Sequence, residues 1–263
     1  MDRIDQKSIA KPKGISEFYD LLAPDYDSMT GFEKRFVQER PFFRLLVERY
    51  GVKTALDAGC GSGFHSLILS ELGVRVTAVD ASAQMVQLTK GHAQARDVSV
   101  EALVASFEEL GGVLKKQFDA VFVMGNSLPH IAKTEGLKRA LKNFFNLLKP
   151  DGILFTQNLN YDRILAHREQ VQNVKEVGEK TFVRSYEYDQ DGILFNIVTR
   201  TSSGGKPEER SQTIRLKPLL QNDFVGLLTE AGFADVKLFG GISMEPFNPE
   251  SSKDLVVLAR KPA

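Results

Sequence analysis

The stretch ALDAGCGSG at residues 55–63 joins a predicted strand, Lys53–Ala58, to a predicted helix, Phe64–Leu72. Glycines in such a turn tolerate positive φ angles and let a ligand approach the backbone without meeting a Cβ atom. In open α/β sheets, ligands bind outside the carboxyl ends of the strands, where this turn lies. The stretch therefore predicts a ligand-binding loop in an α/β protein.

Strands and helices alternate along the chain after this loop. Apolar runs predict strands, and amphipathic runs predict helices, one capped by Ser82 and one ended by Pro150-Asp151-Gly152. The expected strands are Val74–Val79, Val98–Val104, Phe118–Met124 and Ile153–Asn158, and the expected helices are Ser82–Arg96 and Thr134–Lys149. This alternation predicts a parallel sheet with helices on both faces.

The segment before the loop reads as helical over residues 15–50. We expect Pro41 to begin a second helix, which Gly51 ends. The preceding tail mixes charges of both signs, as in Asp2, Arg3 and Lys7, and is typical of a solvated end rather than a binding arm.

The pattern changes after Tyr161. Residues 166–217 contain β-rich runs separated by turns at Asp189–Gly192 and Ser202–Pro207, which predicts a small antiparallel insertion. The expected strands are Lys180–Tyr188, Ile193–Thr199 and Arg210–Leu216. We expect the insertion to cover the ligand-binding site and to set the specificity for the acceptor that binds there. Alternatively, the insertion forms a subunit interface. A helix, Leu219–Ala231, and two strands, Asp235–Phe239 and Asp254–Arg260, complete the chain.

Composition narrows the function classes. The 263 residues include 34 Lys and Arg against 34 Asp and Glu, so no overall positive charge favours nucleic acid as a partner. No apolar stretch is long enough for a membrane span, and the N-terminus lacks a secretory pattern. The single cysteine, Cys60, fits a reducing compartment, so we expect a cytoplasmic protein. No clustered Cys and His motif supports a metal site.

Two acidic residues beside the loop help to choose the ligand. Asp80 ends the second strand, 17 residues after Gly63, where an acid can accept hydrogen bonds from both ribose hydroxyls. The dinucleotide fingerprint needs a glycine where this chain has Phe64. Asp57 would repel a pyrophosphate but suits a ligand with an ammonium group. These residues favour an adenosyl amino acid over NAD.

DAGCGSG at residues 57–63 and VDAS at 79–82 resemble the first two motifs of class I S-adenosylmethionine-dependent methyltransferases. The resemblance implies a Rossmann-like, mostly parallel seven-stranded sheet of order 3-2-1-4-5-7-6, with its last strand antiparallel. The expected core is 51–165 with 218–263, joined to an N-terminal helical lid, 1–50, and the insertion, 166–217.

The same resemblance implies the residues that hold S-adenosylmethionine. The loop would wrap the amino acid part of the cofactor, Asp80 would hold its ribose, and Met85 would pack on its adenine. The candidate cofactor-binding residues are Tyr19, Tyr26, Asp57, Gly59, Cys60, Gly61, Asp80, Ala81, Met85, Ser106, Phe107, Met124, Gly125 and Asn126. Met85 and Phe107 are alternatively ordinary core residues.

Two further segments narrow the resemblance. MGNSLPH at 124–130 and NYDRIL at 160–165 resemble glycine N-methyltransferase and its glycine/sarcosine relatives. This branch implies a small-molecule amine acceptor, with His130 and Tyr161 as candidate catalytic residues near the methyl group. A capping or core histidine and a core tyrosine are the alternatives for these two.

One position departs from that branch. Leu159 stands where the glycine enzymes carry an arginine for the substrate carboxylate, so we expect glycine to be a poor acceptor. Arg163, Arg168 and Arg184 are candidates for a replacement. The sequence leaves open an O- or C-methyltransferase, a non-catalytic cofactor-binding protein, and a homo-oligomer.

Overall fold

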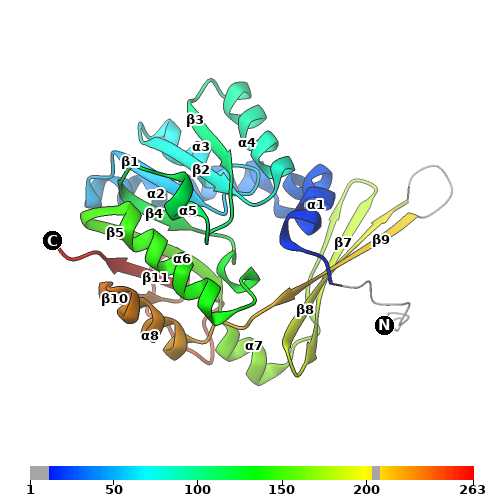
Figure 1. Ribbon diagram of the computed structural model, residues 1–263. Helices are drawn as coiled ribbons and strands as arrows, with labels where there is room; N and C mark the ends of the chain where they lie inside the picture. The colour runs from blue at the N-terminus through cyan, green and yellow to red at the C-terminus, as the bar shows by residue number, and fades with distance from the viewer. Residues whose placement is uncertain (1–11, 203–207) are drawn as a thin grey trace.

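A computed structural model describes residues 12–202 and 208–263, which form two β-sheets and the helices around them (Figure 1). The larger sheet contains β1 (Thr54–Ala58), β2 (Arg75–Asp80), β3 (Val100–Val104), β4 (Phe118–Val123), β5 (Leu148–Leu159), β10 (Ala234–Phe239) and β11 (Asp254–Arg260). Its order is β10-β11-β5-β4-β1-β2-β3, and β11 runs antiparallel to both of its neighbours. This confirms the predicted seven-stranded order and its antiparallel strand.

Helices cover both faces of this sheet. They are α1 (Ile15–Thr30), α2 (Phe32–Tyr50), α3 (Phe64–Glu71), α4 (Ala83–Ala95), α5 (Leu110–Val113), the 3-10 helix η1 (Leu128–His130), α6 (Thr134–Leu147), α7 (Tyr161–His167) and α8 (Gln221–Ala231). Side chains of β4 alternate between two apolar cores: Val121 packs with Phe144 of α6, and Phe122 with Phe43 of α2. The sheet is therefore buried on both sides, as its uninterrupted apolar strands indicate.

The insertion forms a separate four-stranded antiparallel sheet, which lies beside α1 (Figure 1). Its strands are β6 (Val171–Val177), β7 (Lys180–Asp189), β8 (Gly192–Thr201) and β9 (Glu208–Leu216), in that order. The sequence analysis missed β6. Its apolar residues Val171, Val174 and Val177 are spaced by three and are exposed, so the two-residue alternation of a half-buried strand is absent.

Two predicted boundaries were wrong. Pro41 does not begin a helix but lies inside α2, because Gly31 already separates α1 from α2 with a left-handed conformation, φ 75°. Likewise β5 begins at Leu148, which pairs with Phe118, so the segment expected to end a helix instead continues as strand through Asp151 at φ 60°.

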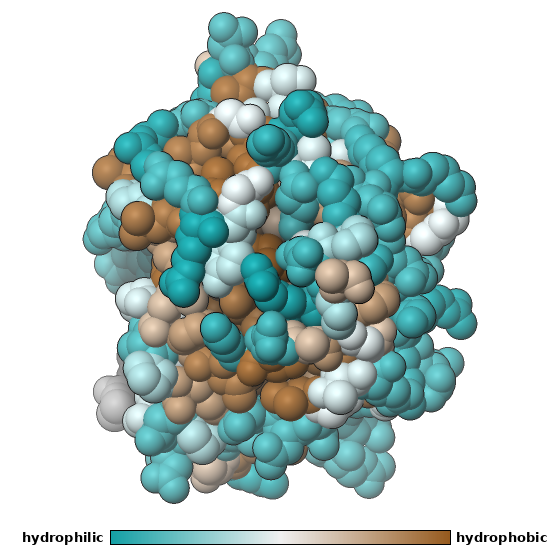
Figure 2. All heavy atoms as spheres, turned by 90° about the vertical axis from the view of Figure 1, so that its left-hand side faces the viewer, coloured by the Kyte–Doolittle hydropathy of each residue, from teal (hydrophilic) through white to brown (hydrophobic). Residues whose placement is uncertain are grey.

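The predicted N-terminal charges at Arg3 and Lys7, and most of the turn Ser202–Pro207, lie outside the described residues. Within the described ranges, no helix combines the length and apolar character needed to cross a membrane. On the side of the core turned away from the four-stranded sheet, polar side chains surround a patch of apolar ones (Figure 2).

Candidate functional site

A cavity of about 620 Å³ opens at the carboxyl ends of β1, β2 and β4. It lies where open α/β sheets bind their ligands. Most of the residues expected to hold the cofactor line it: Tyr19, Tyr26, Gly59, Cys60, Gly61, Asp80, Ala81, Ser106, Phe107, Met124 and Gly125. His130, expected to be catalytic, also lines this cavity.

The loop after β1 leaves room for a ligand because two of its glycines have left-handed backbones. Gly59 has φ 75°, and a Cβ atom there would lie 2.8 Å from Ser127 Oγ. Gly61 has φ 56°, and its Cβ would lie 3.2 Å from the hydroxyl of Tyr26. Any other residue would be strained at either position and would also fill the space between the loop and its neighbours.

Asp80 lines the cavity and is partly buried. Its Oδ2 accepts a hydrogen bond from the Gly61 N–H at 2.9 Å, and its Oδ1 accepts one from the Ser82 N–H at 2.9 Å. Burial raises the pKa of this carboxyl to about 6, although the two backbone N–H groups favour its ionised form. Each carboxylate oxygen keeps a lone pair that can accept a ligand hydroxyl.

Four predicted site residues do not line this first cavity: Asp57, Met85, Asn126 and Tyr161. Asp57 is fully buried; Ser66 Oγ donates to its Oδ2 at 2.6 Å, and its Oδ1 has no partner among the described residues. Met85 is also fully buried, which fits its alternative as a core residue. The chain itself thus leaves a buried acceptor atom on Asp57 close behind the loop.

A second cavity, of about 420 Å³, shares several wall residues with the first, including Tyr19, Tyr26, Gly125 and His130. Asn126 and Leu159 of the core line it on one side. The insertion supplies further wall residues: Gln172, Arg184, Tyr186, Phe195, Ile197 and Leu216. The two cavities therefore meet beside α1, with the insertion bordering only the second.

Polar contacts at this junction are formed between side chains that are distant in sequence. The Tyr19 hydroxyl and His130 Nε2 lie 2.8 Å apart, while His130 Nδ1 is buried without a partner in the described chain. Asn126 Nδ2 donates to the Tyr161 hydroxyl at 2.9 Å. Burial lowers the pKa of His130 to about 4 and raises the pKa of Tyr161, so both are neutral near pH 7.

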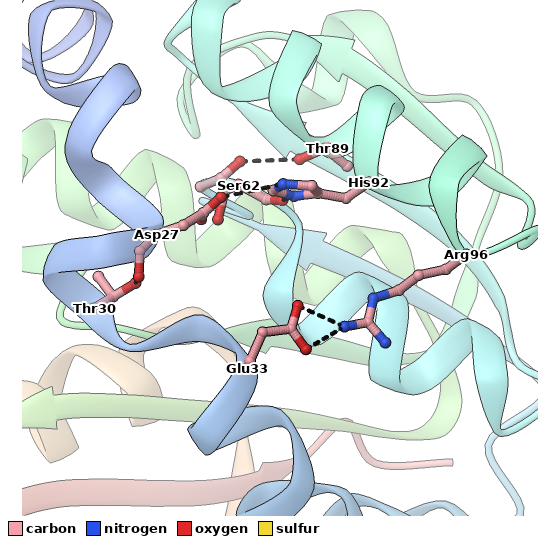
Figure 3. A network of polar contacts seen from close by, with 8 residues as sticks. Asp27, Thr30, Glu33, Ser62, Thr89, His92 and Arg96 are labelled. Carbon is pink, nitrogen blue, oxygen red and sulfur yellow. Dashed lines mark hydrogen bonds and ion pairs between the residues drawn. The ribbon is translucent and has the colours of Figure 1, made fainter.

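Helix α1 is held over the cofactor loop by contacts with α4 (Figure 3). His92 lies between Asp27 and the loop: its Nε2 is 3.1 Å from Asp27 Oδ2, and its Nδ1 is 2.8 Å from the Ser62 carbonyl oxygen. Arg96, which directly follows α4, donates to both carboxylate oxygens of Glu33 in the neighbouring helix α2 at 2.9 and 3.0 Å. These contacts hold the segment that carries Tyr19 and Tyr26 at the cavity.

Several lining residues escaped the sequence analysis. Arg35, Ser62 and His65 line the first cavity, and Gln157 and Asp254 the second. Gln157 lies near the carboxyl end of β5, so its place in an α/β sheet was a usable signal. Arg35 gave no such signal in the sequence, because it reaches the cavity only through the packing of α2.

Comparison with known proteins agrees with this geometry. Residues 55–152, which include the loop, match a family model described as a methyltransferase domain. A curated glycine/sarcosine N-methyltransferase of Aphanothece halophytica is 27% identical over 94% of this chain and 90% of its own length. The glycine N-methyltransferase of Rattus norvegicus is 34% identical over 46% of this chain and 45% of its own.

Residues 55–152 thus form a methyltransferase domain, and the chain as a whole is similar in sequence and fold to S-adenosylmethionine-dependent methyltransferases. Its fold is shared with a solved S-adenosylmethionine-dependent methyltransferase from Clostridium acetobutylicum ATCC 824, at a TM-score of 0.80 and 15% identity, covering 93% of this chain and 99% of that one. The methyltransferase family thus accounts for the loop, the sheet order and the cavity at the strand ends.

Proposed function

We propose that this methyltransferase transfers the methyl group of S-adenosylmethionine to the nitrogen of a small-molecule amine. The observation that carries the proposal is the pair of adjoining cavities that share Tyr19 and His130 as walls. The first would hold the cofactor and the second the acceptor. The names of the glycine/sarcosine relatives support nitrogen as the methylated atom.

The residues of the first cavity fit the cofactor. Asp80 would accept hydrogen bonds from the ribose hydroxyls, and the backbone at Gly59 and Gly61 would lie against the amino acid part. The unpartnered Oδ1 of Asp57 is the acceptor expected beside an ammonium group. Bound S-adenosylmethionine supplies a methyl group already activated by the positive sulfur.

The chain's own task is to orient the acceptor and to exclude water. A neutral amine needs no strong base while it attacks, whereas a hydroxyl acceptor does. His65 and His130 both line the two cavities, and the pKa of His130, about 4, makes it a weak base at neutral pH. His130 and Tyr161 would therefore position the amine through hydrogen bonds, which favours nitrogen over oxygen as the acceptor atom.

We assign one role to each of the three segments that the sequence analysis distinguishes. Residues 1–50 would close over the cofactor, 51–165 and 218–263 would form the methyltransferase core, and 166–217 would cover the acceptor. The insertion would set specificity, because its side chains border the second cavity and leave the first to the core and α1.

The proposal is tested by incubating the purified protein with S-adenosylmethionine carrying a labelled methyl group and a pool of small metabolites. We expect label in small N-methylated products, identified by mass, and none in added RNA. Label found only on oxygen or carbon would contradict the amine assignment. Cofactor binding without turnover of any metabolite in the pool would contradict catalysis on small molecules.

A further inference from the structure

Arg184 of β7 lies in the wall of the second cavity, is partly buried, and has no carboxylate partner among the described residues. Within residues 12–202 and 208–263, its guanidinium takes part in no hydrogen bond or ion pair. Two other arginines near the site are paired: Arg35 Nε lies 2.7 Å from Glu39, and Arg163 lies 2.9 Å from Glu169. Arg184 therefore brings an unneutralised charge to the cavity.

No described carboxylate is close enough to Arg184 to act on its pKa, although Glu39 and Asp254 also line the cavity. The ionisable groups that affect its pKa are Arg35, Tyr186 and Tyr26, with no described carboxylate among them. Lys175 is also close enough for Arg184 to lower its pKa, and its ammonium group is held by the carbonyl oxygens of Ser28 and Met29. This wall of the cavity is cationic and has donors left for an anion.

Two neighbouring polar groups in the same wall are also unsatisfied. The Tyr186 hydroxyl and Gln172 Oε1 are buried and have no partner within the described residues. Buried polar groups of a native protein normally find a partner, so an orphaned hydroxyl facing a cavity marks a place for one. A guanidinium beside a hydroxyl presents several donors, and a planar carboxylate matches such a set.

On the core side of this cavity, Arg35 is paired with Glu39 and Lys253 is exposed to solvent, so neither matches the unpaired Arg184. Leu159 of β5 occupies the position where the resembled glycine enzymes carry their arginine, and it lines the second cavity with an apolar side chain. Arg168, the remaining candidate, is exposed, lies over the Tyr188 ring and is absent from the cavity wall.

We propose that Arg184, assisted by the Tyr186 hydroxyl, binds a carboxylate of the acceptor from the insertion side of the cavity. The inference rests on the proposed amine methylation and narrows its substrates to amines that carry a carboxylate. Arg184 is then a specificity-determining residue that contacts the acceptor away from the nitrogen.

Acetate titrated into the protein loaded with S-adenosylhomocysteine tests the subsite without any turnover. Calorimetry at constant ionic strength compares the wild type with Arg184→Gln and with Arg168→Gln as the matched control. We expect acetate to bind the wild type and the control, and its affinity to fall about tenfold or more in Arg184→Gln. Equal acetate affinity in all three proteins, or no binding to the wild type, overturns the proposal.

Turnover of matched amines tests the substrate class. The pairs are sarcosine with dimethylamine and 4-aminobutyrate with butylamine, which differ by the carboxylate. We expect the wild type to prefer the acid of each pair, and Arg184→Gln to raise its KM about tenfold while changing kcat less. Arg184→Lys should restore part of the affinity, because it keeps the charge but loses the bidentate geometry.

The two experiments separate the possible failures. A wild type that methylates the amine of each pair as well as the acid contradicts the carboxylate subsite and leaves the amine function standing. If neither member of any pair is methylated, the amine function fails, and the acetate titration still decides whether Arg184 binds a carboxylate.

Discussion

At the scale of single residues, the cofactor cavity depends on a carboxylate that burial keeps close to protonation. Asp80 is held by the N–H groups of Gly61 and Ser82, and its pKa is raised to about 6. Because the folded pKa lies above the unfolded one, the proton on Asp80 stabilises the ligand-free fold at acidic pH, and this contribution is lost as pH rises through about 6. A ligand that donates hydroxyls favours the ionised form.

We predict that Asp80→Ala weakens S-adenosylmethionine binding by about 1.5–3 kcal/mol, the usual scale for hydrogen bonds to a charged group. In the wild type, the dissociation constant should also rise as pH falls below about 6, where Asp80 gains a proton. Calorimetry between pH 5 and 8 measures both effects, with the exposed Asp97→Asn as control. An unchanged dissociation constant in Asp80→Ala would show that this residue does not hold the ribose.

A second residue-scale prediction concerns Leu159. Its apolar side chain lines the second cavity, so a substrate as short as glycine finds no cationic group at this position. We expect glycine to be a poor acceptor and Leu159→Arg to raise the rate on glycine or sarcosine. Steady-state assays measure this, with Leu159→Met controlling for side-chain length. Robust glycine turnover by the wild type, not improved by the arginine, would contradict the prediction.

At the scale of elements, the closure of α1 over the loop depends on side chains of α4. His92 is placed between Asp27 and the Ser62 carbonyl, and hydrogen bonding to Asp27 raises its pKa (Figure 3). Since this histidine gains its partner on folding, the contact is fully present at acidic pH and is lost as pH rises through the raised pKa.

We therefore predict that amide protection factors of residues 15–30, corrected for intrinsic exchange, decrease between pH 6 and 9. His92→Gln should remove this pH dependence, because glutamine does not titrate, while His167→Gln at the exposed end of α7 should retain it. Hydrogen exchange followed by mass spectrometry measures the effect. The same decrease in His92→Gln would show that His92 does not control the closure.

The insertion shows what element patterns predict and what they miss. The strands β7 and β8 were predictable because their apolar residues are frequent and Asp189–Gly192 gives a hairpin turn. Strand β6 was not, because its exposed valines follow no two-residue alternation and its pairing with β7 decides its conformation. The helix start predicted at Pro41 was also wrong, because the left-handed conformation of Gly31 places the start of α2 earlier in the chain.

At the scale of the whole molecule, the equal numbers of basic and acidic residues give the protein no overall positive field. Two cationic side chains, Arg184 and Lys175, lie close together on the sheet that the insertion adds to the core. The shared core thus carries the cofactor cavity, and the added sheet carries much of the second cavity's wall.

The sequence by itself determined the strands of the larger sheet and the place of the loop after β1, and its resemblance to class I methyltransferases implied the sheet order. The strands and the loop follow from local rules: apolar runs form the strands, and glycines between β1 and α3 permit left-handed backbone. Only the tertiary structure decided that Tyr19 meets His130, 111 residues away, and that Arg184 lines the second cavity with no ion-pair partner among the described residues. Such pairings depend on how α1 and the insertion pack against the core, and no periodicity within either segment encodes that packing.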